Sequence, residues 1–177
     1  MDIQTNRLLL KSISVEDRDF IFSQFSDGVV TKYLYDEEPL TSISGADEII
    51  ASYVNSNSIA LCRWIIIRKS DHVKMGTCGF HCWNANENII DIGYDLKEAF
   101  WGNGYMQEAI KEIINIVVQE LKIKQINAHI YFENDKSINL AERLGFHFNG
   151  QEYHCVFRGK EYLHRVFSLD CTGLMWN

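Results

Sequence analysis

The sequence has a single proline, Pro39, and lacks any run of apolar residues that approaches the length of a membrane span. Its first residues also lack the apolar core of a secretory signal peptide. We therefore expect a cytoplasmic protein with no membrane partner. The 177 residues are 46% hydrophobic, which suffices for one sizeable core, so we expect a single domain over residues 1–177.

Positive charge is also scarce, since 17 Lys and Arg residues stand against 24 Asp and Glu residues, for a formal net charge of −7. Nucleic-acid binding depends mainly on clustered basic side chains, so we expect no nucleic-acid partner. An acidic balance mildly favours a cationic partner such as an amine, although surface charge often serves solubility alone.

The five cysteines are scattered and odd in number, which favours reduced, buried thiols over a disulfide framework. Cys78, His81 and Cys82 are close together in the chain. Strand alternation would place Cys78 and Cys82 on one face and His81 on the other. No second Cys or His pair completes a tetrahedral zinc shell, so we predict no metal site.

Strand and helix patterns alternate along the chain. Alternating or continuous apolar runs predict seven strands, at residues 7–11, 61–67, 73–83, 89–96, 125–132, 150–157 and 160–169. The pattern as a whole indicates an α/β (α+β) sandwich with a mixed, mostly antiparallel sheet.

Helices are predicted between these strands. Apolar residues spaced by three and four indicate a helix over 106–121, and a short helix over 137–144 ends at Gly145. Two Ser–Asp pairs resemble helix-opening boxes, namely Ser14 with Asp17 and Ser44 with Asp47.

A glycine-spaced loop, Gly102-Asn103-Gly104, stands between the strand at 89–96 and the helix that begins near Met106. This order directs backbone N–H groups and a helix N-terminus at one small volume, which suits a phosphate group. Taken alone the signal is weak, because a dinucleotide fold needs a third glycine at Gln107 and a Walker loop needs Gly-Lys-Ser or Gly-Lys-Thr. From these residues alone, a plain turn is the alternative.

Four segments of the chain, one of which contains this loop, match segments of a known family in the same order. They are Thr5-Asn-Arg-Leu-Leu-Leu-Lys11, Gly76-Thr-Cys-Gly-Phe80, Ile92-Gly-Tyr with Trp101-Gly-Asn-Gly-Tyr-Met-Gln-Glu-Ala109, and Asn134-Asp-Lys-Ser137 with Leu144-Gly-Phe146. Through them the chain resembles the GCN5-related N-acetyltransferases (GNAT), in particular the ribosomal-protein or RimJ/RimL-like branch. The resemblance implies a sheet of six to seven strands with helices on both faces, whose fourth and fifth strands splay apart.

The resemblance also implies acetyl-CoA as co-substrate and no metal. The backbone N–H groups that would hold its pyrophosphate are those of Gly102, Asn103, Gly104, Tyr105, Met106 and Gln107, and Trp101, just before them, is also expected to bind the cofactor. The family usually has glycine or alanine where this chain has Met106. The pantetheine arm would insert between the strands at 89–96 and 125–132, and its main-chain contacts would come from Tyr94, Asp95 and Leu96.

By the same resemblance, an amine attacks the thioester directly, and a backbone N–H near Gly93 or Tyr94 stabilises the oxyanion. Asn134 and Ser137 are the expected catalytic residues and would also bind the cofactor, since Asn134 matches a residue that contacts the pantetheine arm and Ser137 matches a hydroxyl that protonates the departing thiolate. The residues themselves leave alternatives. Asn134 equally fits a helix cap, Ser137 a helix serine without chemistry, and Trp101 a core aromatic.

The sequence does not single out the base that deprotonates the amine. Asp91, Glu133, His81 and a water chain are the candidates. Residues 20–54 are expected to shape the acceptor pocket, for a protein N-terminus or a small-molecule amine. The alternative function is a non-catalytic acyl-CoA-binding module, either a sensor or a part of an assembly. An exposed edge strand in the C-terminal hairpin would allow a homodimer.

Overall fold

The computed structural model describes residues 1–34, 38–55 and 58–174, and its strands form one sheet. The strands are β1 (Ile3–Gln4), β2 (Leu8–Ser12), β3 (Arg63–Arg68), β4 (Lys74–Asn84), β5 (Ile89–Leu96), β6 (Gln125–Tyr131), β7 (His147–Phe157) and β8 (Lys160–Asp170). Their order across the sheet is β1-β2-β3-β4-β5-β6-β8-β7. Neighbouring strands are antiparallel except β5 and β6, which are parallel. The predicted mixed, mostly antiparallel sheet is confirmed.

The sheet has eight strands rather than the expected six or seven. The additional strand, β1, is two residues long and pairs Ile3 with Leu10 and Gln4 with Leu9. Two residues are too few to show a hydrophobic period, so the pattern did not reveal this strand.

Helices cover both faces of the sheet, as expected. They are α1 (Arg18–Phe25), α2 (Ile43–Val54), α3 (Tyr105–Leu121) and α4 (Asp135–Arg143), with the short 3-10 helices η1 (Val15–Asp17), η2 (Thr31–Tyr33), η3 (Ile59–Leu61) and η4 (Glu98–Phe100). In β3, Trp64 and Ile66 belong to the core shared with α3, whereas Ile65 and Ile67 pack with residues of α1 and α2. The four consecutive residues from Trp64 to Ile67 are all buried because both faces of β3 are covered.

The start of α2 differs from the prediction. The helix begins at Ile43 with Ser42 as its N-cap residue, so Ser44 lies inside the first turn. Asp47 does not close a box with Ser44, because its carboxylate accepts a hydrogen bond from Arg18 of α1 at 2.6 Å. A contact between two helices therefore overrides the local capping pattern.

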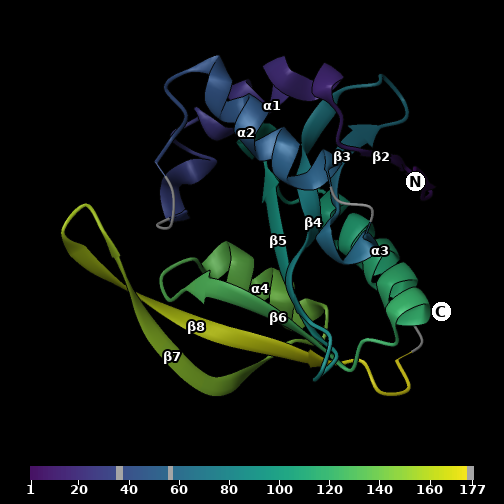
Figure 1. Cartoon of the computed structure of the whole chain (residues 1–177), viewed down its shortest axis with the longest axis vertical. Coiled ribbons are helices and arrows are strands. Elements are labelled where there is room, and N and C mark those ends of the chain that lie inside the picture. The colour runs from purple at the N-terminus through teal and green to yellow at the C-terminus, as the bar shows by residue number, and fades with distance from the viewer. Residues whose placement is uncertain (35–37, 56–57, 175–177) are drawn as a thin grey trace.

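The C-terminal hairpin forms as predicted and extends the sheet beyond β6 (Figure 1). β8 pairs with β6, which leaves β7 at the edge. None of the helices within the described residues has the length and apolar character needed to cross a bilayer.

Candidate active site

β5 and β6 separate along their length. Their parallel ladder runs from Ile89 with Gln125 to Asp91 with Asn127, and no described residue of 92–96 pairs with β6. Figure 1 shows the two strands diverging. Backbone groups of β5 that face the gap are therefore available to an extended ligand. This is the predicted splay, and it falls between the fifth and sixth strands because β1 adds one to the count.

The glycine loop ends at the N-terminus of α3. Gly102 and Gly104 have φ of +75° and +76°, in the left-handed region that glycine adopts without strain. Gly104 is the N-cap residue of α3, and no side chain in the described part of the chain caps it. The N–H groups of the first turn therefore keep their hydrogen-bonding capacity, which suits a phosphate. The Asn103 side chain holds the loop by donating to the carbonyls of Phe100 and Trp101 at 3.3 and 2.9 Å.

Arg7 braces this loop, although the sequence reasoning did not single it out. Its Nη1 donates to the carbonyl of Asn103 at 2.9 Å, and its Nε donates to Glu108 at 2.7 Å. Its guanidinium carbon also lies 4.5 Å from the centre of the Tyr105 ring. Burial disfavours ionisation of Glu108, but hydrogen bonds from Thr5 and Arg7 outweigh it and lower the pKa of Glu108. Arg7 thus holds its guanidinium against the loop.

Met106 departs from the family pattern without blocking the loop. Its side chain is 6% exposed and lies in the core with that of Ile110. Only its backbone is therefore presented at the first turn of α3, where a glycine or alanine would present the same group. Tyr105 and Gln107, on either side of it, are partly exposed.

Trp101 is held in place rather than buried. Its Nε1 donates to the carbonyl of Leu96 at 2.7 Å, and the ammonium of Lys136 lies 3.8 Å from the centre of its ring. Lys136 belongs to α4, which follows β6, whereas Trp101 belongs to the loop that follows β5. This cation–π contact, of a type that contributes about 0.5–1 kcal/mol at exposed sites, joins the elements on the two sides of the gap.

Asn134 and Ser137 lie at the start of α4, which begins at Asp135 rather than at the predicted residue 137. The cause is a cap, since Asn134 Oδ1 accepts a hydrogen bond from the Ser137 N–H at 3.2 Å. The capping role that the residues left open for Asn134 is thus observed. It fixes Ser137 in the first turn of the helix.

The hydroxyl groups of Ser137 and Tyr94 form a pair across the gap, 2.8 Å apart. Burial raises the pKa of Tyr94 to about 12, and the hydrogen bond with Ser137 only partly opposes this. The phenol therefore keeps its proton at neutral pH. The sequence suggested main-chain contacts for Tyr94, and nothing in it paired this side chain with a serine 43 residues away.

Asp95 is a structural centre as well as a predicted main-chain contact. Its carboxylate accepts hydrogen bonds from Arg63 Nη2 and Gln24 Nε2, both at 2.7 Å, and from the N–H and hydroxyl of Thr77. Burial lowers the pKa of Arg63, but Asp95, followed by Tyr53, raises it by more, so the guanidinium stays charged. One buried ion pair thus ties together α1, α2, β3, β4 and β5.

A cavity of about 680 Å³ adjoins β5, and residues 20–54 supply much of its lining, as predicted for the acceptor pocket. Tyr94 and His81 lie on its sheet side, and the acidic residues Glu38 and Glu48 lie on the other. Arg158 of the β7–β8 turn donates to Glu38 at 2.7 Å. The Glu48 carboxylate has no hydrogen bond or ion pair with any residue in the described ranges.

The three candidate bases have different surroundings. His81 lines the cavity. Asp91 lies with its Oδ2 3.4 Å from Nε2 of His129. Glu133 is exposed beyond the end of β6 and does not line the cavity.

Strand alternation fails at Cys82, so the predicted arrangement of Cys78, His81 and Cys82 is wrong. The β4–β5 register shifts between His81 and Asn84, and Cys82 has φ of +52°. Cys78 is buried in the core, whereas Cys82 is exposed beside His81 and Asp91. Burial, and then the charge of Asp91, raise the pKa of the Cys82 thiol.

Comparisons with known proteins agree with this geometry. A family model described as an acetyltransferase (GNAT) domain matches residues 7–147. A Bacillus licheniformis protein described as the uncharacterized N-acetyltransferase p20 is 34% identical over 151 residues, which are 84% of this chain and 83% of that protein.

Two solved structures show the same fold. The ribosomal-protein-S5-alanine acetyltransferase of Vibrio fischeri has a TM-score of 0.81 and 18% identity, with 96% of each chain covered. The spermidine N-acetyltransferase of Vibrio cholerae, in complex with CoA and spermine, has a TM-score of 0.80 and 19% identity, covering 95% of this chain and 98% of that one. The predicted superfamily is confirmed: this chain belongs to the GNAT family and is an N-acetyltransferase.

Proposed function

We propose that residues 1–177 form one catalytic domain that transfers the acetyl group of acetyl-CoA to a primary amine by direct attack in a ternary complex. The observation that carries this proposal is the gap between β5 and β6 together with the uncapped N-terminus of α3, whose preceding loop contacts α4 through Trp101 and Lys136. In the gap, the unpaired backbone of the strand is available to an extended arm. At the start of the helix, free N–H groups are available to a phosphate. A cofactor with both parts fits both features at once.

The cofactor contacts follow from this placement. The backbone of Tyr94, Asp95 and Leu96 would bond the pantetheine arm, and the loop from Trp101 to Gln107 would bind the pyrophosphate with Arg7 beside it. Asn134 would act mainly by capping α4, which holds Ser137 at the gap.

Tyr94 and Ser137 would together protonate the thiolate that leaves. Their hydroxyl groups are 2.8 Å apart and face each other across the gap, where the arm would end. The raised pKa of Tyr94 means that its phenol is protonated at neutral pH and that the phenolate is disfavoured, so Tyr94 would act as a relay. Ser137 would give its proton to sulfur and take one from Tyr94, and the proton that the attacking amine loses would restore the phenol, so that no charge remains.

Acetyl-CoA is expected to stabilise the protein against heat. A ligand that binds only the native state contributes about 2.7 kcal/mol at a hundred times its dissociation constant, which raises the melting temperature by several degrees. Gly102→Ala is expected to reduce the shift, because a side chain there would obstruct close approach of a phosphate.

Gly159→Ala is the matched control for this measurement. Gly102 and Gly159 have φ of +75° and +71°, and an added Cβ would meet nothing within 4 Å at either. Both substitutions therefore carry similar backbone strain, but Gly159 lies in the β7–β8 turn. An absent shift in the wild type, or equal shifts in the two variants, would contradict the proposed cofactor site.

The acceptor is proposed to be an amine that carries a second positive charge. The Glu48 carboxylate lines the cavity without a partner among the described residues, and a distal ammonium would supply one. Because Glu48 is exposed to solvent, an ion pair with it contributes about 1 kcal/mol at most, so Glu48→Gln is expected to raise the KM for a diamine by up to about fivefold.

Asp19→Asn is the control for the acceptor, because it removes the same charge from an exposed position of α1 outside the cavity. It is expected to leave the KM unchanged. Steady-state kinetics with a diamine and with a monoamine of equal length separate the two cases. An equal KM for the diamine in wild type and Glu48→Gln would rule out this role for Glu48.

The branch, the homodimer and the cytoplasmic location stay predictions. The RimJ/RimL-like branch is supported by the fold shared with a ribosomal-protein acetyltransferase. The homodimer would use β7, an eleven-residue strand at the sheet edge.

A further inference from the structure

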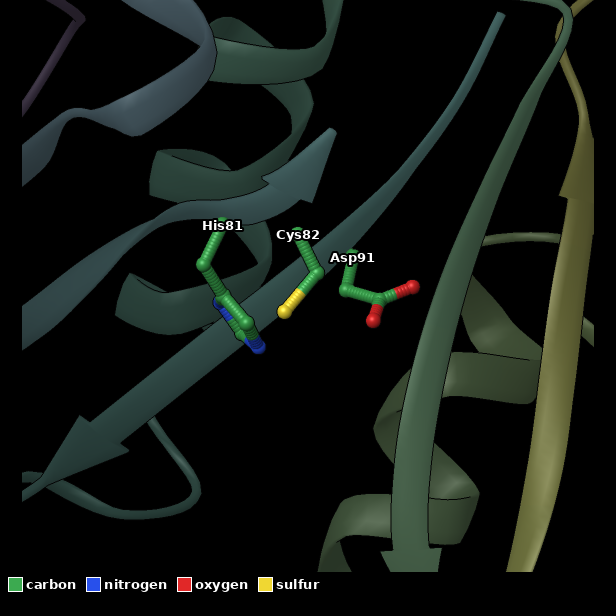
Figure 2. Close-up of side chains that lie close together, drawn as sticks. All are labelled: His81, Cys82 and Asp91. Atoms are coloured by element: carbon green, nitrogen blue, oxygen red, sulfur yellow. The ribbon is translucent and has the colours of Figure 1, made fainter. Parts of the chain in front are cut away.

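Three side chains with metal-binding atoms converge where β4 bends. His81 on β4 is the direct cross-strand neighbour of Asp91 on β5, so both side chains stand on the same face of the sheet. A nitrogen of His81, the sulfur of Cys82 and a carboxylate oxygen of Asp91 all lie within 4.8 Å of one another. Figure 2 shows the three side chains next to one another, with Cys82 between the His81 ring and Asp91.

The bulge in β4 creates this arrangement. In a regular strand, Cys82 would face away from its neighbour His81. The register shift after His81 and the φ of +52° at Cys82 turn the thiol to the side of Asp91. A non-glycine residue in the left-handed region is strained, and such bulges often redirect a side chain beside a functional site.

A fourth group supports the cluster from β6. Asp91 is paired with Asn127, and His129 lies two residues further along the same strand, on the same face. Its Nε2 is 3.4 Å from Asp91 Oδ2. Groups that lie against a ligating carboxylate and can hydrogen-bond it orient the ligands of protein-bound metals, and His129 stands where it could play this part.

We propose that His81, Cys82 and Asp91 bind a borderline transition-metal ion such as Zn²⁺, with His129 as a positioning residue for the Asp91 carboxylate. Thiolate, imidazole and carboxylate are the ligands of zinc, whereas Mg²⁺ and Ca²⁺ prefer oxygen ligands alone. Three protein ligands leave a fourth position for water. The exposed thiol and the partly exposed His81 and Asp91 give an ion access from solvent.

This site differs from the metal site that the sequence excluded. That exclusion considered Cys78, which is fully buried in the core, together with His81 and Cys82. Asp91 takes the place of Cys78, and only the fold brings it there. The site does not depend on the proposed acetyl transfer, although His81 also lines the cavity, so an ion would lie at the edge of the cavity.

The test is a titration of the reduced, metal-free full-length protein with Co²⁺, a spectroscopic substitute for Zn²⁺. We expect one equivalent to bind, with a thiolate-to-cobalt charge-transfer band and the intense visible bands of a four-coordinate site, and Zn²⁺ to abolish both. Cys82→Ser is expected to lose the charge-transfer band, whereas Cys155→Ser, which removes a partly exposed thiol on β7, keeps it. No band in the wild type, or a band that persists in Cys82→Ser, would overturn the proposal.

Two further measurements test the site and the role of His129, and the first does not depend on how any variant folds. In the wild type, one equivalent of Zn²⁺ should protect Cys82, but not Cys155, from alkylation read by mass spectrometry; equal labelling with and without zinc contradicts the site. His129→Gln should keep the charge-transfer band and weaken Co²⁺ binding about tenfold, as for other residues that orient metal ligands. Unchanged affinity in this variant would overturn the role given to His129.

Discussion

Replacing Asp95 by alanine is expected to lower the free energy of unfolding by about 3–5 kcal/mol, because it leaves the buried guanidinium of Arg63 without its counter-ion. The Asp95 side chain is 4% exposed and that of Arg63 is 11% exposed, so water cannot readily replace the lost partner. The Gln24 amide and the Thr77 hydroxyl also lose their acceptor. Urea unfolding without cofactor, followed by circular dichroism, measures the change.

Asp71→Ala is the control for this experiment. Asp71 forms an ion pair with Arg68, but it lies in an exposed turn, so its loss is expected to change stability little. A double variant, Asp95→Leu with Arg63→Met, removes both charges and is expected to lose less stability than Asp95→Ala alone. A small loss in Asp95→Ala, similar to that in Asp71→Ala, would contradict the central role of the ion pair.

Ser137→Ala is expected to lower kcat about a hundredfold, as is typical when a proton donor is removed from a reacting group. Tyr94→Phe is expected to act in the same direction, because its hydroxyl is 2.8 Å from the Ser137 oxygen and supplies the next proton. Since both groups would act in one chain, the double variant should be little worse than the more damaged single variant. Release of coenzyme A thiol at saturating acetyl-CoA measures kcat.

Tyr153→Phe is the control for the Tyr94 variant. It removes a phenolic hydroxyl from an exposed residue of β7 and is expected to keep the wild-type kcat. The outcome also separates two roles for the hydroxyl pair. If the KM for acetyl-CoA rises while kcat stays constant, the pair binds the cofactor instead of protonating sulfur. If Ser137→Ala and Tyr94→Phe both release thiol with the wild-type kcat and KM, the hydroxyl pair neither protonates sulfur nor binds the cofactor.

Elements with a strong local period were predictable. The helix over 106–121 was identified by apolar residues every three or four positions, and four of these, Met106, Ile110, Ile113 and Val117, are buried as expected. The glycine loop was predictable from residues that are adjacent in the chain. In the structure, Gly102 and Gly104 adopt positive φ. Met106 illustrates the limit, since only the structure shows that its side chain is buried in the core.

Long-range contacts decided the rest. The sequence indicated that Asp47 closes a helix-opening box, but in the structure its carboxylate accepts a hydrogen bond from Arg18 on another helix. Cys82 follows strand alternation in the sequence, but the bulge against β5 redirects it toward His81.

The sequence by itself determined the order of strands and helices, the loop that suits a phosphate and the superfamily, because each depends on periodicity or on residues adjacent in the chain. The tertiary structure alone decided which side chains meet. The pairing of Tyr94 with Ser137, the burial of Asp95 against Arg63 and the gathering of His81, Cys82 and Asp91 all join residues on different elements. Such contacts depend on strand register and on how the sheet opens between β5 and β6, and neither leaves a local signal in the sequence.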